Sequence, residues 1–234
     1  MDIAILAGGL ATRLGGLSLN KPKSMIEICG KPFIYYQLEY IRKFNFNNNV
    51  VLCISHLGNQ IEEFVKNGEQ FSLNVLYSYD GDVSLGTGGA ILNALNKLSE
   101  NFIVLYGDSY LPLDYNYLIS AYYKKKCDGM ITVYENNNMR HISNIEYRNN
   151  EIISYHKELT SNKMKHVDYG FGIYSKRAFG SFEKEKKFDM FDVNQFLLSS
   201  KSLGSVEVKE QFYEIGSLEG INYTNTYFTN NNIR

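Results

Sequence analysis

The sequence lacks a strong charge of one sign, a long apolar run and a basic leader. Lysine and arginine total 24 against 25 aspartates and glutamates, a formal net charge of -1 at pH 7. That balance gives no long-range electrostatic reason to expect nucleic acid or an anionic membrane as a partner. No apolar run approaches the about 20 residues that span a bilayer. The start at Met1-Asp2-Ile3 lacks the basic n-region of a signal peptide. We expect neither a nucleic-acid nor a membrane partner.

Cysteine is scarce. Cys29, Cys53 and Cys127 are odd in number, and none lies in a C-x-x-C pair. This usage predicts free, buried thiols in a reducing compartment, and therefore a cytoplasmic protein.

The order of apolar segments predicts one α/β domain. The 234 residues suit a single domain with a large core, and no internal repeat or linker interrupts them. Strands are expected at 3–7, 50–55, 73–79 and 102–106, and helices at 31–44, 61–66, 88–98 and 115–124. This alternation predicts a Rossmann-like, mostly parallel sheet with helices on both faces.

The second half changes character. Strands follow in quicker succession at 130–134, 142–147, 152–156 and 167–174, and helices at 188–198 and 218–228 close the chain. We expect a smaller antiparallel part here.

The first loop carries the strongest functional signal. A predicted strand ends in Leu6-Ala7-Gly8-Gly9, followed by Thr12-Arg13 and, farther on, by Lys23. Paired glycines let backbone N–H groups approach phosphate oxygens closely, and Arg13 adds a planar cationic fork suited to phosphate. The alternative is a plain glycine turn with two solvated cations.

Two common phosphate-binding loops are excluded. The Walker pattern requires a Gly-Lys-Ser/Thr run, which does not occur. The dinucleotide fingerprint is approached only at Gly86-Thr87-Gly88, where its last glycine is replaced by Ile91.

Several motifs together resemble the sugar-1-phosphate nucleotidyltransferases, also called NDP-sugar pyrophosphorylases. The motifs that carry the resemblance follow that family's order and are Gly8-Gly9-x-Ala11-Thr12-Arg13, Pro22-Lys23, Leu85 to Ala90, Tyr106-Gly107-Asp108-Ser109 and Phe212 to Gly216. Leu85 to Ala90 looks most like the D-glycero-D-manno-heptose 1-phosphate guanylyltransferases. The resemblance implies an enzyme that condenses a nucleoside triphosphate, with GTP favoured, and a sugar 1-phosphate. The products are pyrophosphate and a nucleotide sugar of the kind used as a capsule or lipopolysaccharide precursor.

The resemblance also implies roles for the nucleotide-binding residues. Arg13 and Lys23 would be catalytic: Arg13 would grip the β- and γ-phosphates, and Lys23 would lie between the α-phosphate and the sugar phosphate. The remaining nucleotide-binding residues would be Leu6, Ala7, Gly8, Gly9, Thr12, Gly86, Thr87 and Gly88. One domain, 1–234, would hold the nucleotide in about 1–125 and the sugar in about 126–234.

Two carboxylates are implied as Mg²⁺ ligands. Asp108 follows a predicted strand at the edge where open α/β sheets bind ligands, and a hard carboxylate suits Mg²⁺. Glu214 takes the place where the family usually has Asp in a D-x-G setting. A turn aspartate and a surface glutamate without a role are the respective alternatives.

The sugar-binding candidates are Asn144, Lys157, Asp168 and Gly170. The local sequences around Lys157 and Asp168 depart from the family pattern, and so the identity of the sugar stays open.

Two other function classes also stay open. A metal-dependent glycosyltransferase would use Asp80-Gly81-Asp82 as a D-x-D motif, but that leaves Arg13 and Lys23 unexplained. A non-catalytic nucleotide-sugar-binding relative is the second alternative. The sequence does not set the oligomeric state, and a homo-oligomer is compatible with it.

Overall fold

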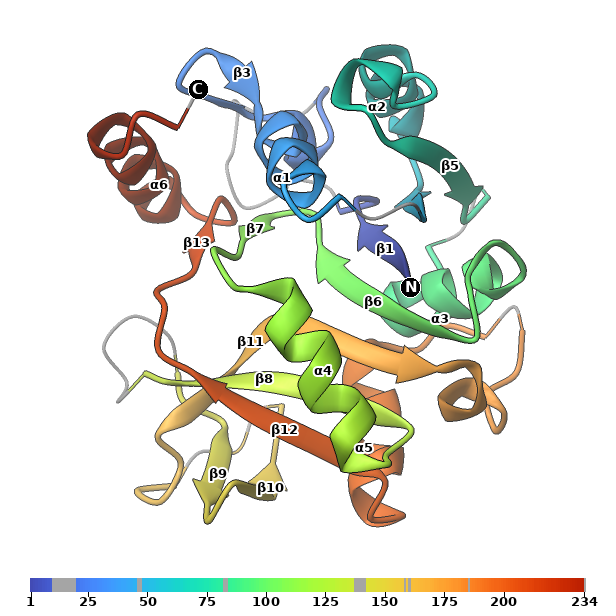
Figure 1. The fold of residues 1–234 in the computed structure, drawn as a ribbon, viewed down its shortest axis with the longest axis vertical. Helices are drawn as coiled ribbons and strands as arrows, with labels where there is room; N and C mark the ends of the chain where they lie inside the picture. The colour runs from blue at the N-terminus through green and yellow to red at the C-terminus, as the bar shows by residue number, and fades with distance from the viewer. Residues whose placement is uncertain are drawn as a thin grey trace.

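A computed structural model describes residues 1–9, 20–45, 48–81, 84–136, 142–157, 159, 161–184 and 186–233. Within these residues one nine-stranded sheet runs through both halves of the chain, with helices on both of its faces (Figure 1). Its main path has the order β10-β9-β11-β6-β1-β4-β5, and β8 and β12 extend it beside β11.

The first half contributes the parallel strands. β1 (Asp2–Leu6) lies between β4 (Asn49–Ile54) and β6 (Asn101–Tyr106), and β5 (Asn74–Tyr79) pairs with the far side of β4. All these pairs are parallel, so the carboxyl ends of the strands meet at one edge. The four predicted strands are confirmed, with each end within one residue.

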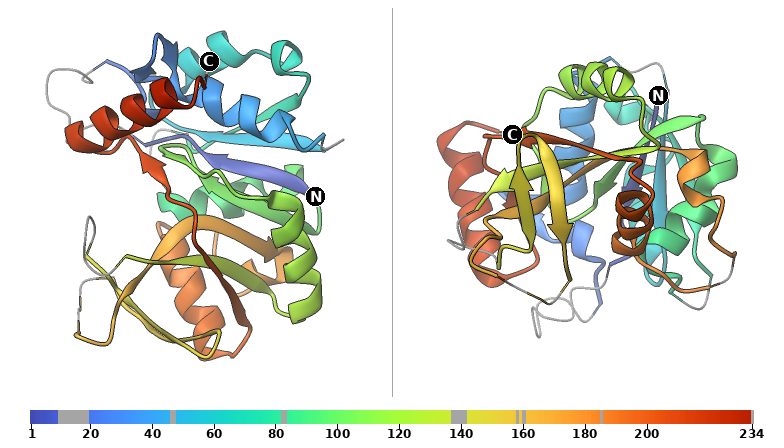
Figure 2. Two further views of the ribbon diagram at one scale, coloured as in Figure 1. Left: turned by 60° about the vertical axis from the view of Figure 1, so that its left-hand side comes forward. Right: turned by 90° about the horizontal axis from the view of Figure 1, so that it is seen from below.

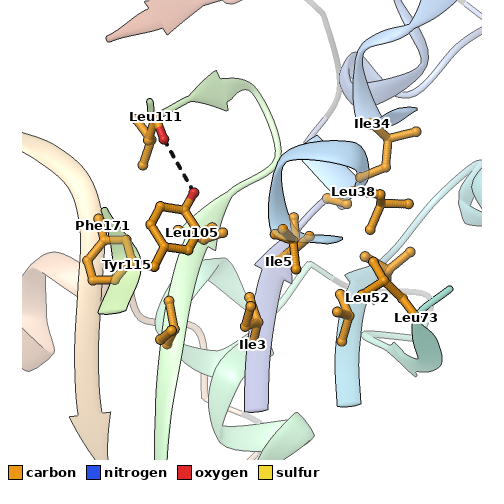
Figure 3. Packing of buried hydrophobic residues seen from close by; sticks show 14 of the residues in the cluster. Ile3, Ile5, Ile34, Leu38, Leu52, Leu73, Leu105, Leu111, Tyr115 and Phe171 are labelled. Atoms are coloured by element: carbon orange, nitrogen blue, oxygen red, sulfur yellow. Dashed lines mark hydrogen bonds between the residues drawn. The ribbon is translucent and has the colours of Figure 1, made fainter. Parts of the chain in front are cut away.

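Alternation along β1 builds the two faces of the core. Ile3 and Ile5 point to one face and Ala4 to the other, as the two-residue period of a strand requires. Figure 3 shows Ile3 and Ile5 packed beside Leu38 and Leu52. The helices on this face are α1 (Phe33–Arg42), α2 (Gly58–Val65) and α4 (Tyr115–Lys125). The opposite face is covered by α3 (Gly86–Ala94) and α5 (Met190–Ser199).

The second half extends the same sheet. β11 (His166–Ser175) runs antiparallel to β6 and to β8 (Gly129–Glu135), and β9 (Ile145–Arg148) and β10 (Glu151–Tyr155) form a hairpin at the end of the path. The prediction of an antiparallel part is confirmed. β12 (Leu203–Val208), parallel to β8, was not predicted. In the left-hand view of Figure 2 the hairpin and β12 lie in the lower half, below the parallel strands of the first half.

The structure corrects several local predictions. α1 begins at Phe33, because Lys31 and Pro32 form the short strand β3 with β2 (Glu27–Ile28). α3 begins at Gly86, two residues early, and gives way after Ala94 to a 3-10 turn. The three cysteines are free, and the prediction of burial is confirmed for Cys53. It is wrong for Cys29, which is exposed on the positive-φ turn after β2, and Cys127 is only half-buried.

Among the described helices, none combines the length and the apolar character that a bilayer crossing requires.

Candidate active site

A cavity of about 430 Å³ lies at the carboxyl ends of β1 and β6. Open α/β sheets place their ligands at this edge. The structure brings together here the predicted residues Leu6, Ala7, Gly8, Gly9, Lys23, Gly86, Thr87 and Asp108.

The described part of the first loop is tied to β4. The Ala7 N–H donates to the carbonyl of Cys53 over 2.9 Å, and the Ser55 hydroxyl donates to the carbonyl of Gly8 over 2.7 Å. A Cβ on Gly8 would lie 2.9 Å from the Ser55 Oγ, whereas one on Gly9 would meet open space. A side chain at position 8 would therefore crowd Ser55, whereas the space beside Gly9, which lines the cavity, is open. Thr12 and Arg13 lie outside the described residues.

Lys23 and Asp108 form an ion pair on the cavity wall. The Lys23 N–H donates to the carbonyl of Gly9 over 3.1 Å, and its Nζ lies 2.9 Å from the Asp108 Oδ2. The side chains are 23% and 31% exposed, so each charge remains accessible from the cavity. Two residues 85 positions apart thus set opposite charges side by side on the cavity wall.

Asp108 lies in a tight turn after β6. The Gly107 N–H donates to the carbonyl of Leu6 over 3.0 Å, and a Cβ on Gly107 would lie only 2.8 Å from that oxygen. Only glycine fits so close to β1. This close approach fixes the start of the turn that presents Asp108.

Glu214 is brought beside Asp108 by a short strand pair. β13 (Tyr213–Glu214) pairs with β7 (Ser109–Tyr110), with Glu214 opposite Ser109. A Cβ on Gly216 would lie 2.8 Å from the Glu214 Oε2, 3.7 Å from the Lys23 Nζ and 3.9 Å from the Asp108 Oδ2. All three charged groups therefore lie near Gly216, although Glu214 lines a second cavity, with Phe212 and Ser217, and not the one that Lys23 and Asp108 line.

Glu214 also makes contacts at the start of α6 (Leu218–Asn230). Its carboxylate accepts hydrogen bonds from the Gly216 N–H and, over 2.8 Å, from the Ser217 hydroxyl. Each carboxylate oxygen can accept more than one bond, so these contacts orient Glu214 without using all of its lone pairs.

Glycines at the start of α3 face the 186–189 segment. Gly86 has a φ of +75°, and the carbonyl of Phe188 accepts from the N–H groups of Gly88 and Gly89 over 3.0 and 3.2 Å. A Cβ on Gly88 would lie 2.4 Å from the Phe188 ring. Of the predicted set, Gly86 and Thr87 line the cavity, while Gly88 packs against Phe188.

Asp80 is a cavity residue that sequence reasoning considered only for the D-x-D alternative. It follows β5, and its Oδ1 is buried without a hydrogen-bond partner in the described part of the chain. Burial raises the pKa of its carboxyl to about 6, which a hydrogen bond from the Leu85 N–H only partly offsets. Asp82, its partner in the D-x-D pattern, lies outside the described residues.

Asp189 is a second missed residue, and it joins the two halves of the chain. Its Oδ2 accepts from the Lys157 Nζ over 2.7 Å, and its Oδ1 accepts from the Thr87 N–H over 3.4 Å. The hydrogen bond from Lys157 is the main reason why the pKa of Asp189 lies below its usual range. The capping box of Asp189 with Asp192 at the start of α5 was visible in the sequence, but it signalled only a helix start.

The other predicted sugar residues lie behind the cavity wall. The pairing of β11 with β8 shifts between Asp168 and Gly172, and in that irregular stretch Gly170 has a φ of +96°. A Cβ on Gly170 would lie 3.5 Å from the ring of Tyr106, which lines the cavity. The Tyr155 hydroxyl donates to Asp168 over 3.1 Å, and burial raises the pKa of Asp168 to about 6.

Asn144 stands apart from these contacts. It lies just before β9, where its N–H donates to the carbonyl of His166 in β11 and its carbonyl accepts from the N–H of His156 just after β10. Its Oδ1 is buried and has no partner among the residues described.

Comparison with known proteins identifies the family of the chain. Residues 3–153 match the family model described as Nucleotidyl transferase. The chain belongs to the nucleotidyl transferase family. Enzymes of this family act on a nucleoside triphosphate and a sugar 1-phosphate and generally use a divalent metal ion. Membership favours the nucleotidyltransferase prediction over the glycosyltransferase alternative.

Three relatives illustrate the family's range. A D-glycero-alpha-D-manno-heptose 1-phosphate guanylyltransferase from Campylobacter jejuni is 26% identical over 92% of this chain and 95% of its own length. The crystal structure of HddC from Yersinia pseudotuberculosis complexed with GMP-PN is 28% identical, with a TM-score of 0.79 over 97% of this chain and 99% of that one. A UTP--glucose-1-phosphate uridylyltransferase from Synechocystis sp. is 29% identical over 53% of this chain, and the match spans only 35% of that longer protein.

Proposed function

We propose that this chain condenses GTP with a sugar 1-phosphate, manno-heptose 1-phosphate first among the candidates, to give a GDP-sugar and pyrophosphate. The full-length similarity to a heptose 1-phosphate guanylyltransferase and to a structure complexed with GMP-PN supports this choice of substrates. Within the chain, the observation that carries it is the buried Oδ1 of Asp80 in the cavity, which has no hydrogen-bond partner among the residues described.

Asp80 suits guanine because of its hydrogen-bonding pattern. The Watson–Crick edge of guanine offers N–H donors, and a carboxylate is an acceptor only. A buried acceptor without a partner costs free energy that a donating base can recover. With a pKa of about 6, Asp80 is mainly ionised at pH 7 and ready to accept. Uracil and thymine offer only one N–H at the same edge and would satisfy the Asp80 carboxylate less well.

The phosphates fit the other end of the cavity. Gly9 leaves space beside the loop backbone, and Lys23 supplies a cation on the wall. We assign to Arg13 a second cation for the β- and γ-phosphates.

We assign Asp108 and Glu214 as the ligands of a Mg²⁺ ion near Gly216. Mg²⁺ is commonly held by one or two carboxylates, with phosphate and water oxygens completing the octahedron, and two carboxylates lie near Gly216. In the described residues no group of three or more His, Cys, Asp or Glu is placed to hold a metal. When bound, Mg²⁺ supplies positive charge shared between the carboxylates and the phosphates.

The reaction is an in-line displacement at the α-phosphorus. An oxygen of the sugar phosphate attacks, a new P–O bond forms, and the bond to the β-phosphate oxygen breaks as pyrophosphate leaves. Lys23 lowers the repulsion between the two anions as they approach, and Arg13 stabilises the charge on the leaving group. Both reactants must also be aligned, which the fixed turn at Gly107 and the tied loop at Gly8 favour.

Lys157, Asp168, Gly170 and Asn144 are proposed to select the sugar, Lys157 through its reach to the cavity beside Asp189. In this proposal a single domain holds the nucleotide with residues 1–125 and the sugar with 126–234. The free thiols suit the cytoplasm, where we place the activity.

A substrate panel tests the proposal. Purified protein with Mg²⁺ is given GTP, CTP, UTP, dTTP or ATP together with each of several sugar 1-phosphates, and pyrophosphate release is followed. We expect release with GTP and a heptose 1-phosphate, lost in Asp108→Ala and Arg13→Ala. Equal release from all five nucleotides would refute the assignment of Asp80. Absence of nucleotide binding would refute the function.

A further inference from the structure

Gln37 is a buried polar residue to which the proposed chemistry gives no role. It lies on the inner side of α1 with 4% of its surface exposed, beside the buried apolar residues Leu38 and Ile34. An apolar side chain of the same size would fill this place without the cost of burying an amide. The presence of an amide therefore calls for a specific contact.

The amide nitrogen of Gln37 donates two hydrogen bonds to the short segment 106–109. The Gln37 Nε2 donates to the carbonyl of Tyr106 and to the carbonyl of Ser109, each over 2.8 Å. These carbonyls flank Gly107 and Asp108. One side chain thus clamps the two ends of the turn that presents the Asp108 carboxylate.

The other contacts of this turn come from elsewhere. Gly107 donates to Leu6 in β1, and the carbonyl of Asp108 accepts from the Ile215 N–H over 3.0 Å. Neither contact engages the carbonyls of Tyr106 and Ser109. Without Gln37, those two oxygens would lose the donor that holds them at a fixed separation.

We propose that Gln37 is a positioning residue for the divalent metal: its amide holds the Asp108 turn in the geometry in which the carboxylate binds the ion. This inference rests on the proposed function, which gives Asp108 its metal. Groups that orient a ligating residue typically change metal affinity by about 10–100-fold when they are removed.

The test compares Gln37→Met with a matched control, Tyr40→Phe. Methionine keeps the length and volume of the side chain and removes the two donors. Tyr40 lies on the same helix, and its hydroxyl donates to the carbonyl of Leu113 over 3.0 Å, beyond the Asp108 turn. Both variants therefore lose hydrogen bonds from α1 to a backbone carbonyl, but only Gln37→Met releases the turn.

The readout is Mn²⁺ binding to each full chain in the presence of GTP, followed by the electron paramagnetic resonance of free Mn²⁺, together with the Tm. We expect Gln37→Met to raise the Mn²⁺ concentration at half-saturation about 10–100-fold and Tyr40→Phe to leave it unchanged. Gln37→Leu, which also lacks both donors and carries no charge, should behave like Gln37→Met and serves if that variant does not fold.

Two outcomes overturn the inference and one separates it from the proposed function. An unchanged midpoint in the Gln37 variants, or an equal rise in Tyr40→Phe, would reduce Gln37 to a structural contact. Asp108→Asn is measured in parallel. If it too leaves Mn²⁺ binding unchanged, the metal site itself is wrong; if it abolishes binding while the Gln37 variants do not change it, only the inference fails.

Discussion

The two ends of the cavity differ in the exposure and the partners of their carboxylates. At the end proposed to hold the phosphates, Asp108 is paired with Lys23 and about a third exposed. At the end proposed to hold the base, Asp80 accepts a hydrogen bond from the Leu85 N–H, and its buried Oδ1 has no partner among the described residues. A paired, accessible carboxylate can exchange its partner for a metal ion during a reaction. A buried carboxylate oxygen without a partner favours a ligand that donates a hydrogen bond to it, so we expect the first end to govern rate and the second to govern selectivity.

The largest effect should follow from Asp108→Asn. Loss of the charge should lower kcat by about 10²–10³ and leave the preference for GTP intact. Steady-state kinetics of pyrophosphate release measures both. Asp114→Asn is the matched control, because Asp114 caps α4 with its side chain and asparagine caps equally well. Similar losses in both variants would point to damaged folding rather than to a lost ligand.

Lys23→Met should have an effect of the same kind, about 10²–10³ in kcat, because the repulsion between two anionic reactants is no longer lowered. Lys21→Met serves for comparison, since Lys21 forms only an exposed pair with Glu27. If Lys23→Met raised KM for GTP and kept kcat, its role would be binding rather than catalysis.

Asp80→Asn should sharpen the contrast by leaving kcat nearly unchanged and raising KM for GTP. Asparagine offers one neutral acceptor oxygen instead of two charged ones. We therefore expect KM for GTP to rise about tenfold to a hundredfold, because a charge-assisted hydrogen bond contributes about 1.5–3 kcal/mol. Asp168→Asn, which changes a buried carboxyl in the half proposed to bind the sugar, should alter KM for the sugar phosphate instead. A raised KM for all five nucleotides in Asp80→Asn would contradict a role in base recognition.

Protonation of Asp80 should make the stability of the protein and its affinity for GTP change with pH in opposite directions. Its folded pKa of about 6 lies above the ordinary value of 3.8, so between these values the folded state binds more protons than the unfolded state. Stability should therefore fall as pH rises through this window, and Asp80→Asn should be more stable than the parent at pH 7. KM for GTP should rise as pH falls below about 6. Thermal unfolding and kinetics from about pH 5 to 8 check both, and a flat KM would contradict the second.

The smallest effect is expected from Lys157→Met. The Lys157–Asp189 pair is largely exposed, so it adds little stability. KM for the sugar 1-phosphate should nevertheless rise a few-fold, while Lys209→Met, which breaks another exposed pair, should change nothing. A change in KM for GTP alone would place Lys157 with the nucleotide.

Local sequence patterns were enough for the parallel strands and for the meeting of Gly8 and Asp108 at one edge of the sheet. Each follows a strand whose apolar run is plain, and parallel strands must bring their carboxyl ends together. β12 was missed because Leu203–Val208 is only partly apolar, and its place depends on pairing with β8.

The missed site residues depend on contacts between distant segments. Asp80 matters because it is buried beside Leu85 without a full set of partners among the described residues, and burial of one carboxylate cannot be read from its neighbours in the chain. Asp189 matters because Lys157 and Thr87 both reach it, across 32 and 102 positions of sequence. Such contacts form only when the whole chain has folded, so the local sequence does not reveal them.

The most direct measurement of the central claim is mass spectrometry of the products from GTP and manno-heptose 1-phosphate with Mg²⁺. The account predicts a GDP-heptose and pyrophosphate in equal amounts, with no product from a preformed GDP-sugar. Inorganic phosphate and GDP as the nucleotide products, or sugar transfer from the GDP-sugar, would contradict it.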